Sequence, residues 1–343
     1  MPVRVGVNGY GTIGKRVADA VVRQSDLVLS GIADIRPNFE IVTARAKGYP
    51  VFVAGPGNAE EFQAGGIDVA GRVEALVRAS DLIIDCAPEG VGRENAKTYQ
   101  EAGVPAIFQG GEKADVAEVS FSALANFDAA RGKKRVRVVS CNTTGLSRAV
   151  AVLLPSFGVE HWEATLARRA ADPHESGKGP IDGILPTFTI PSHHGPDVQT
   201  LFPALSIATT AMVVSTTLMH VHANHVRLSR PPASTKEVIE RFRASPRFHV
   251  FRKSDRVMGT PQVLEYARDR SPGGRPDMME NVVWEQGIHL KGGDLYFFQA
   301  IHQESIVIPE NIDAVRAMLG LASSAAASIE MTDRALGIPR PAL

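Results

Sequence analysis

The stretch Val3-Arg-Val-Gly-Val-Asn-Gly-Tyr-Gly-Thr-Ile-Gly14 decides the fold of the first half of this chain. Residues 3–7 are typical of a buried β-strand, and residues 15–22, which follow the stretch, have helical character. Between them stand three glycines with the spacing G-x-G-x-x-G, which is informative in this strand–turn–helix setting. Gly9 permits the tight turn, Gly11 lets a pyrophosphate approach the backbone, and Gly14 lets helix and strand pack closely. The stretch therefore predicts a dinucleotide-binding turn.

Residues around this turn indicate which dinucleotide it binds. Thr12 and Ile13 offer backbone amides at the helix N-terminus, where a phosphate is favoured. Asp34 ends the next strand-like run twenty residues beyond Gly14, and an acidic residue at about that distance accepts hydrogen bonds from the ribose of NAD. Arg36 lies close by and suits the 2′-phosphate of NADP. We therefore expect NAD to be preferred and leave the use of NADP open.

Further strand-like runs alternate with helical segments in the first half of the chain, at residues 82–85, 104–108 and 135–139. Such alternation predicts an α/β fold with a doubly wound, Rossmann-type parallel sheet. Ligands of these sheets bind beyond the carboxyl ends of the strands. Gly111, in the turn after the second of these runs, is therefore assigned to the cofactor site.

Beyond about residue 150 the pattern changes. Runs typical of antiparallel strands occupy residues 163–169, 205–214, 219–228 and 295–301, and helical patterns occupy 236–242 and 261–268. Residues 172–198 are rich in Gly, Pro and His, which predicts a long ordered loop of the kind that carries function. We therefore expect an α+β catalytic domain with a mostly antiparallel sheet.

Composition and charge narrow the class of protein. Thirty-seven basic residues balance thirty-seven acidic ones, so no net field draws the chain to nucleic acid or an anionic membrane. The weakly polar run 204–219 is interrupted by Ser and Thr and is shorter than the roughly 20 residues that span a bilayer. The chain has two cysteines and no signal-peptide pattern at its start. We expect a soluble cytoplasmic protein that binds neither nucleic acid nor membrane.

Cys141 is the candidate nucleophile. It lies in Ser140-Cys-Asn-Thr-Thr144, where a strand-like run gives way to a helical one. Backbone amides and the positive end of a helix dipole favour a thiolate there, and the thiolate is the nucleophilic form of cysteine. Asn142 and the local amides are candidates for stabilising an oxyanion. The other cysteine, Cys86, is left open as either buried or redox-active.

A nucleophilic cysteine needs a nearby base, and imidazole is the side chain whose charge changes near pH 7. Five histidines are candidates for this role: His193, His194, His220, His222 and His225. His220 and His222 are two residues apart on one strand and share a face, so periodicity does not choose between them. A zinc site is disfavoured because no further cysteines with ligand spacing accompany the histidines, and we expect no metal.

Seven motifs, in order along almost the whole chain, carry a family likeness. They are Asn8-Gly-Tyr-Gly-Thr-Ile-Gly-Lys15, Phe108-Gln-Gly-Gly-Glu-Lys113, Ser140-Cys-Asn-Thr-Thr144, Arg168-Arg-Ala-Ala-Asp172, Pro191-Ser-His-His194, Thr216-Thr-Leu-Met-His220 and His302-Gln-Glu-Ser305. In these motifs the chain resembles the archaeal-type (type II) phosphorylating glyceraldehyde-3-phosphate dehydrogenases.

The resemblance implies roles for individual residues. Cys141 matches the family's nucleophile, and His220, which follows Thr-Thr-Leu-Met, matches its base. Matches to the family's cofactor-site positions are Thr12, Ile13, Gly111, Arg169 and Gln303. Matches to its substrate-site positions are Ser140, Asn142, His194 and Gly195, with His193 adjacent. Candidate ligands for the phosphates are Arg168, Lys178, Thr143 and the loop with His193 and His194.

The resemblance also implies an organisation for the chain. A helix around residues 312–321 returns to the nucleotide domain, so that domain consists of residues 1–140 and 304–343, with the catalytic domain at 141–303. The likeness further implies a homotetramer. Some relatives place a lysine suited to NADP where this chain has Asp34, which supports NAD and leaves dual use open.

The reaction implied is the oxidation of glyceraldehyde 3-phosphate to 1,3-bisphosphoglycerate, with NAD or NADP reduced and inorganic phosphate as co-substrate. Cys141 forms a thiohemiacetal and then a thioester, and His220 removes the hydroxyl proton. One alternative with the same Cys–His chemistry is a semialdehyde dehydrogenase or acyl-phosphate reductase. An alternative of another class is a non-catalytic redox or nucleotide sensor.

Overall fold

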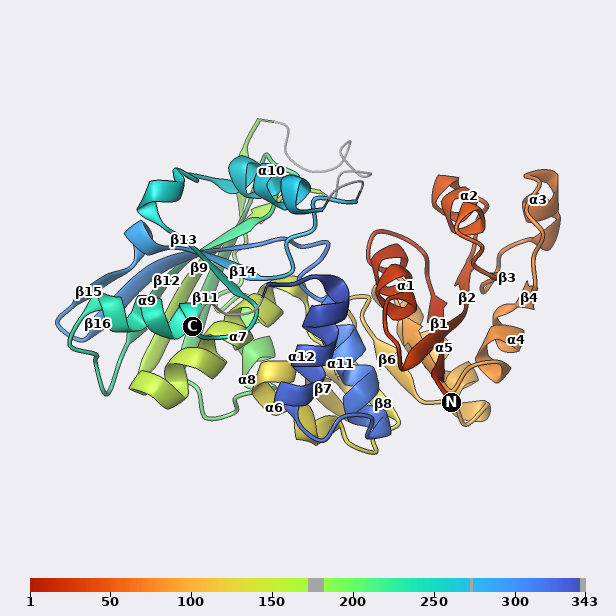
Figure 1. The fold of residues 1–343 in the computed structure, drawn as a ribbon, viewed down its shortest axis with the longest axis horizontal. Helices are drawn as coiled ribbons and strands as arrows, with labels where there is room; N and C mark the ends of the chain where they lie inside the picture. Colours follow the sequence, from red (N-terminus) through yellow and green to blue (C-terminus); the bar gives the residue numbers. More distant parts are fainter. Residues whose placement is uncertain (172–181, 272–273, 340–343) are drawn as a thin grey trace. The chain divides into compact units, whose positions relative to one another are not determined.

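The computed structural model describes residues 1–171, 182–271 and 274–339 (Figure 1). The chain forms two compact units. The first unit consists of Met1–Ser140 and Ile308–Gly337, and the second consists of Cys141–Val307 with residues 338 and 339. The returning segment was expected to span residues 304–343, whereas in the structure it begins at Ile308 and ends at Gly337.

A parallel sheet forms the centre of the first unit, with the strand order β4-β3-β2-β1-β5-β6-β8-β7. The chain starts at the inner strand β1, moves outward to β4 and then returns to the other side of β1 through β5, so the sheet is doubly wound. The α/β fold class expected from the sequence is confirmed. The strands are β1 (Val3–Asn8), β2 (Leu27–Asp34), β3 (Val51–Val53), β4 (Gly71–Arg72), β5 (Leu82–Asp85), β6 (Ala106–Phe108), β7 (Val119–Phe121) and β8 (Arg135–Val138).

Helices cover the parallel sheet, which explains its apolar strands. Val5 and Val7 of β1 are fully buried, as are Ile83 and Ile84 of β5, because a parallel sheet is normally covered on both faces. The helices of this unit are α1 (Gly14–Val22), α2 (Phe39–Ala46), α3 (Ala59–Ala64), α4 (Val73–Arg78), α5 (Val91–Glu101), α6 (Ala123–Asn126), α11 (Ile308–Leu319) and α12 (Ala325–Leu336).

Helix α11 is anchored in the first unit although it lies near the end of the chain. It packs against α1 and β8, beside which it is drawn in blue in Figure 1. Arg316, which is 1% exposed, donates to both oxygens of Asp26 at 2.7 and 2.8 Å. The amide of Ala123 donates to Glu310 at 2.6 Å. These polar contacts tie the late helix to the turn before β2 and to the start of α6.

The second unit contains a mixed sheet with the order β10-β11-β9-β12-β16-β14-β13, and β15 pairs with β16. The pairs β11–β9 and β13–β14 are parallel and the others are antiparallel, so the mostly antiparallel sheet is as expected. Its strands are β9 (His161–Arg169), β10 (Ile184–Pro186), β11 (Ile207–Val214), β12 (His220–Arg227), β13 (Phe248–Phe251), β14 (Asn281–Trp284), β15 (His289–Lys291) and β16 (Asp294–Ile301).

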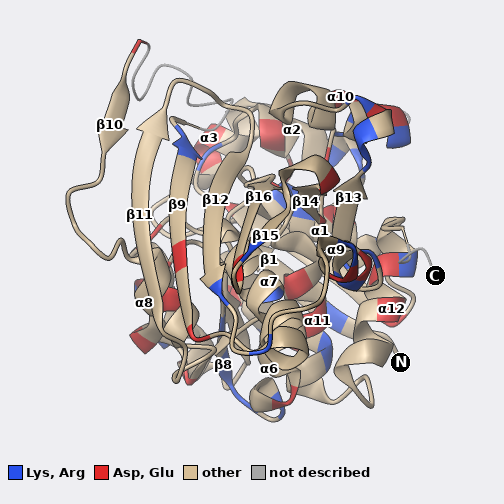
Figure 2. Cartoon of the chain, turned by 90° about the vertical axis from the view of Figure 1, so that its left-hand side faces the viewer, with Lys and Arg blue, Asp and Glu red and all other residues tan. Residues whose placement is uncertain are grey.

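Helix α7 (Cys141–Phe157) packs on one face of this mixed sheet. Leu146, Val150 and Leu153 of the helix are fully buried and form one core with Trp162 and Leu166 of β9. Figure 2 shows few charged residues along the middle of β11, β12 and β16. The remaining helices of the unit are α8 (His194–Gln199), α9 (Thr235–Arg243) and α10 (Thr260–Arg270).

The structure corrects several expected boundaries. The run expected to be a strand from residue 219 begins instead at His220, because Met219 has a φ of 66°, which a strand does not accommodate. The expected loop 172–198 holds β10 and the first turns of α8 in its described part, and residues 172–181 lie outside the described residues. The helix expected at 312–321 begins one turn earlier, at Ile308.

Within the described ranges, none of the helices is both long enough and apolar enough to cross a bilayer.

Candidate functional site

Cys141 is the first residue of α7, a helix of 17 residues. The first-turn amides of such a helix have no partner within the helix, and the helix dipole places partial positive charge there. The Cys141 Sγ lies 3.5 Å from the Nε2 of His220, the first residue of β12. The structure therefore brings together the cysteine and one of the five candidate histidines, although 79 residues separate them in sequence.

His220 is buried, and both of its ring nitrogens are engaged. The backbone amide of Arg169 donates to Nδ1 at 2.9 Å, so Nδ1 accepts and the neutral ring carries its hydrogen on Nε2, facing the Cys141 sulfur. Burial lowers the pKa of His220 well below its usual value, and His222, Arg169 and Arg168 act in the same direction. The resting imidazole is thus neutral and presents an N–H to the sulfur.

Asn142, the second residue of α7, lies between two further histidines. His222 Nε2 lies 2.8 Å from the Asn142 Oδ1, and the Asn142 Nδ2 lies 3.4 Å from the Nε2 of His194. Burial lowers the pKa of His222 to about 3. Burial, with nearby cations, lowers the pKa of His194 to about 2. His220 and His222 therefore share one face of β12, as expected, but contact different residues of the helix.

Two arginines end β9, where Figure 2 shows the strand in blue. Burial lowers the pKa of the Arg168 guanidinium, while the neighbouring Cys141 sulfur acts to raise it. The Nε of Arg168 is buried and has no hydrogen-bond partner among the described residues. A buried, unsatisfied guanidinium N–H next to a sulfur is a suitable donor for an anionic ligand. Arg169 adds the backbone contact to His220.

The loop and helix α8 place the remaining substrate-site candidates of the second unit. His193 is exposed and its ring lies 3.9 Å from that of the buried His194. Gly195 is buried and its amide donates to Thr209 at 3.0 Å. Thr143 Oγ1 donates to Asp197 at 2.7 Å, which links α7 to α8. Ser140, half-buried, is the last residue of the first unit.

Gln303, expected at the cofactor site, is 5% exposed. Its Nε2 donates to the carbonyl of Thr217 at 3.2 Å. Its Oε1 is buried and accepts no hydrogen bond from the described residues. An unsatisfied amide oxygen of this kind is available to accept an N–H from a bound group.

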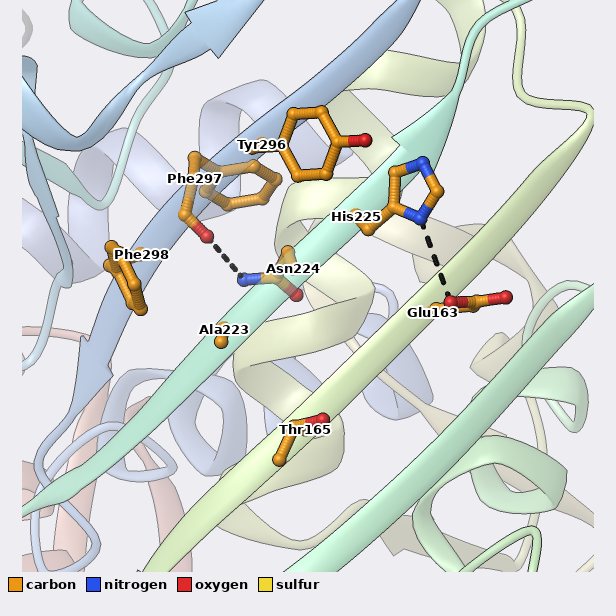
Figure 3. Close-up of a pocket in the computed structure, with 8 residues that line it drawn as sticks. All are labelled: Glu163, Thr165, Ala223, Asn224, His225, Tyr296, Phe297 and Phe298. Atoms are coloured by element: carbon orange, nitrogen blue, oxygen red, sulfur yellow. Dashed lines mark hydrogen bonds and ion pairs between the residues drawn. The ribbon is translucent and has the colours of Figure 1, made fainter.

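His225 lies on the opposite face of β12 from His220 and His222 and does not contact the residues around Cys141 and Asn142. Its Nε2 contacts Asp294 at 2.9 Å and its Nδ1 contacts Glu163 at 3.5 Å. Its ring stacks on Tyr296 with centroids 4.7 Å apart. His225, Glu163 and Tyr296 are among the residues that line a shallow hollow of about 240 Å³ on that face (Figure 3). Because side chains alternate between the faces of a strand, this hollow is separate from the site at Cys141.

In the first unit, the turn after β1 has the geometry expected of its glycines. Gly9 has a φ of 92°, and a Cβ on Gly14 would lie 1.8 Å from the Gly9 carbonyl oxygen, so neither position accommodates another residue. A Cβ on Gly11 would meet no atom within 4 Å. Space beside Gly11 is what close approach of a pyrophosphate requires. Thr12 and Ile13 directly precede α1, so their amides lie at its N-terminus.

Asp34 ends β2 beside the glycine turn. Its carboxylate accepts the amides of Tyr10 at 2.9 Å and Ile35 at 2.7 Å. Burial raises its pKa, and the amide hydrogen bonds oppose that rise. The carboxylate thus lies at the carboxyl edge of the sheet, where a ribose hydroxyl would be recognised.

Gly110 and Gly111 are both glycine for different physical reasons. Gly111 is exposed with a φ of 86°, which favours glycine. A Cβ on Gly110 would lie 1.6 Å from the Ala87 carbonyl oxygen, so this glycine lets the turns after β5 and β6 pack together. Gly110 is thus a required residue that the sequence did not single out. Its position directly before Gly111, after a strand, was the available signal.

Cys86 has an environment opposite to that of Cys141. Burial of its thiol and the charge of Asp85 raise its pKa well above the usual value. A raised pKa leaves little thiolate at neutral pH and so favours a structural role. Among the residues that the structure describes, no three His, Cys, Asp or Glu side chains are grouped as metal ligands would be. Lys178, a candidate phosphate ligand, lies outside the described residues.

Three residues that support the site were not singled out from the sequence: Asp197 and Gln299, which contact Thr143 and His222, and Arg148, which anchors α7. Arg148 is fully buried and donates to the carbonyls of Met279 and Ile306, which fixes α7. Gln299 lies opposite His222 in the pairing of β12 with β16. The signal available for Gln299 was a polar residue at an inward position of an otherwise apolar strand.

Comparison with known proteins identifies relatives along the whole chain. Residues 140–272 match the family model described as the C-terminal domain of glyceraldehyde 3-phosphate dehydrogenase. The chain is 49% identical over 340 residues to the glyceraldehyde-3-phosphate dehydrogenase of Archaeoglobus fulgidus, with 98% of each chain covered. It is 50% identical over 341 residues to that of Halobacterium salinarum, covering 98% of this chain and 100% of the relative. It is 47% identical over 338 residues to that of Thermococcus kodakarensis, covering 98% and 99%.

These similarities confirm the resemblance that the seven sequence motifs predicted. They extend over both units, and they include the segment that holds Cys141 and the second unit's sheet. The chain therefore belongs to the glyceraldehyde-3-phosphate dehydrogenase family, in its archaeal type.

Proposed function

We propose that this chain oxidises glyceraldehyde 3-phosphate to 1,3-bisphosphoglycerate, with reduction of NAD or NADP and consumption of inorganic phosphate. The observation that carries the proposal is the pair formed by the Cys141 sulfur, at the start of α7, and the His220 Nε2, 3.5 Å away. Membership of the family supports the choice of substrate.

The first unit fits a nicotinamide dinucleotide. The turn beside Gly11 has space for a pyrophosphate, and the amides of Thr12 and Ile13 begin a helix that favours its charge. Asp34, at the end of β2, supports a preference for NAD, because a carboxylate accepts from a ribose hydroxyl and repels a 2′-phosphate. From the family likeness we also assign cofactor binding to Gly111 of the first unit and to Arg169 and Gln303 of the second. The bound nicotinamide supplies a hydride acceptor.

Cys141 is the proposed nucleophile. Attack of its thiolate on the aldehyde carbon forms a C–S bond and moves the negative charge to the aldehyde oxygen. Loss of hydride from that carbon converts the thiohemiacetal to a thioester. Attack of inorganic phosphate on the thioester then releases 1,3-bisphosphoglycerate and restores the thiolate. Charge balances because the negative charge of the thiolate is consumed when hydride leaves.

His220 is the proposed partner of both the sulfur and the aldehyde oxygen. Because its Nδ1 accepts the Arg169 amide, the Nε2 hydrogen points to the sulfur and can stabilise the oxygen as it gains charge. The role expected from the sequence, removal of the hydroxyl proton by Nε2, requires the other tautomer and the loss of the Arg169 hydrogen bond. We therefore favour the donor role, which a substitution described in the Discussion tests.

Anion binding is assigned to the second unit. Arg168, which is half-buried, supplies a guanidinium whose buried Nε has no partner among the described residues, and Thr143, His193 and Gly195 are the further candidates from the family likeness. Asn142 is proposed to donate to the charged oxygen of the thiohemiacetal, and Ser140 precedes the nucleophile. In this proposal the first unit is the dinucleotide-binding domain and the second the catalytic domain. We also expect a homotetramer in the cytoplasm, which light scattering and fractionation would test.

A steady-state assay tests the proposal. We expect glyceraldehyde 3-phosphate to reduce NAD faster than NADP at equal concentration, and omission of inorganic phosphate to reduce turnover at least tenfold. Turnover with an amino-acid semialdehyde instead of the phosphorylated aldehyde would contradict the proposed substrate. Cofactor binding and thiol alkylation without turnover on any of these aldehydes would favour the sensor alternative.

A further inference from the structure

A row of hydrogen-bonded, buried polar side chains in the second unit includes Asn142 near its middle. It consists of Asn281, Gln299, His222, Asn142, His194, Ser192 and Thr209, and none of them is more than 3% exposed. In the same order, they come from β14, β16, β12, α7, α8, the segment before α8 and β11. Burying this many polar groups is costly unless each finds a hydrogen-bond partner.

The direction of donation follows from the Asn281 end of the row. Asn281 Nδ2 donates to the backbone carbonyl of Gly145 at 2.7 Å and to the Gln299 Oε1 at 2.9 Å. A backbone carbonyl can only accept, so the orientation of the Asn281 amide is fixed. The Gln299 Nε2 therefore faces the His222 Nδ1 at 3.1 Å and donates to it. His222 then carries its hydrogen on Nε2 and donates it to the Asn142 Oδ1 at 2.8 Å.

The Thr209 end gives the same direction independently. The Gly195 amide donates to Thr209 Oγ1 at 3.0 Å, and Thr209 Oγ1 donates to the Ser192 carbonyl at 3.0 Å. Because the hydroxyl hydrogen of Thr209 is used, the Ser192 Oγ must donate to Thr209 Oγ1 at 2.8 Å. The His194 Nδ1 must then donate to Ser192 Oγ at 3.0 Å, which leaves the His194 Nε2 to accept from Asn142 Nδ2.

We propose that this row, here called the Asn142 relay, is a positioning device for the Asn142 side-chain amide. It holds the Nδ2 donor on the side away from His222, where an anionic oxygen of the substrate can accept from it. The proposal rests on the proposed function, in which Asn142 neighbours the nucleophile. His222 is the central positioning residue, because its Nε2–H holds the Asn142 Oδ1. If the Asn142 side-chain amide rotated by 180°, its Oδ1 would take the place of its Nδ2, and an acceptor would lie where the reaction requires a donor.

Two further observations support the relay. The contact between Asn142 Nδ2 and His194 Nε2, at 3.4 Å, is the longest in the row, so a substrate oxygen can take that donor at little cost. Both nitrogens of His194 are engaged inside the protein, so this residue acts through Asn142. Burial also keeps both imidazoles neutral, since it lowers the pKa of His222 to about 3 and that of His194 to about 2.

A matched pair of substitutions tests the role of His222. His222→Gln keeps an N–H near the Nε2 position, whereas His222→Leu has a similar size and removes it. We expect His222→Leu to lower kcat for aldehyde oxidation about 30-fold to 100-fold, with KM for the cofactor within about twofold of wild type. We expect His222→Gln to stay within about fivefold of wild type. Folding is checked by thermal denaturation.

Alkylation of Cys141 by iodoacetamide is the internal control. Because the relay does not include the sulfur or His220, the rate should stay within about twofold of wild type in both variants. A folded His222→Leu variant with wild-type kcat would overturn the relay, as would a His222→Gln variant impaired as strongly as His222→Leu.

The tautomers can be measured without turnover. In ¹⁵N-histidine spectra of the wild-type protein, we expect His222 to be protonated on Nε2 and His194 on Nδ1 throughout pH 5.5–8. Loss of signals in His222→Gln and His194→Gln assigns them. The opposite tautomer at either ring, or titration in this range, would overturn the relay. Absence of turnover in the wild-type protein would instead count against the proposed function. The spectra would still show whether His222 and His194 have the tautomers that the relay requires.

Discussion

At the scale of the residue, Cys141 carries the most direct prediction. Replacing it by serine keeps the size of the side chain but removes the thiolate that the start of α7 favours. We expect Cys141→Ser to lower turnover at least a thousandfold while the dissociation constant of the cofactor stays within about threefold of wild type. Initial rates and calorimetric binding measure the two effects. Oxidation of the aldehyde at an appreciable rate by this variant would rule out the covalent mechanism.

His220 offers a test that separates donation from proton removal. Gln has an amide N–H that can occupy the position of Nε2 but cannot act as a base near neutral pH, whereas Ala has neither group. Because the Arg169 amide fixes the tautomer with Nε2–H, we expect His220→Gln to keep about a tenth or more of wild-type kcat and His220→Ala to lose at least a hundredfold. Equal losses in the two variants would support the base role instead.

At the scale of the element, two glycines of the turn between β1 and α1 should differ in their roles. Gly14 should be needed for folding, and Gly11 should be needed for binding of the dinucleotide. Ala at position 14 would bring a Cβ to 1.8 Å from the Gly9 carbonyl oxygen, whereas Ala at position 11 meets nothing within 4 Å. We expect Gly14→Ala to lower the free energy of unfolding by about 2 kcal/mol. We expect Gly11→Ala to unfold like wild type but to bind the dinucleotide at least tenfold more weakly. Wild-type binding by Gly11→Ala would show that the pyrophosphate does not approach this turn.

At the scale of the whole molecule, Arg316 ties the late helix α11 to the early part of the chain. It is buried and pairs with Asp26, so its removal leaves a carboxylate without its partner. We expect Arg316→Met to destabilise the first unit by about 3–5 kcal/mol. The matched control, Arg334→Met, removes an exposed pair with Glu330 and should cost less than about 1 kcal/mol. Faster hydrogen exchange in α1 and β8 of Arg316→Met, but not of Arg334→Met, is the expected readout.

The stability of the second unit should depend on pH through its neutral histidines. His194 and His222 have folded pKa values of about 2 and about 3, below the value of about 6.5 for an unfolded histidine. The unfolded chain therefore binds more protons below pH 6.5, and stability falls as the pH falls. Between pH 7.5 and pH 5 we expect each ring to cost roughly 2 kcal/mol. Both tryptophans, Trp162 and Trp284, lie in this unit, so fluorescence-monitored urea unfolding reports it.

The control for this pH dependence is the double variant His194→Gln, His222→Gln, which should lose the contributions of these two rings between pH 7.5 and pH 5. It should keep those of His220 and His249, whose pKa values burial also lowers. A wild-type unfolding midpoint that does not change over this range would contradict the neutral, buried state of both rings.

Local patterns were enough to predict the α/β fold, the glycine turn and the position of Cys141. Each depends on residues that are neighbours in sequence: the turn of Gly9, Gly11 and Gly14 lies within six residues, and a cysteine that begins a helix needs only the helix that follows it. The period-two pattern of β12 also placed His220 and His222 on one face.

Periodicity left His220 and His222 equivalent, and the choice of His220 came from the family likeness; only the tertiary structure showed which histidine contacts Cys141 and supplied the groups around both. Their difference depends on how β12 lies against the first turn of α7, and that contact spans 79 residues of sequence. The tautomer of His220 depends on the neighbouring strand β9, and the orientation of Asn142 depends on Gln299 of β16. Hydrogen bonds between distant strands have no period in the sequence, because they follow from sheet order and register.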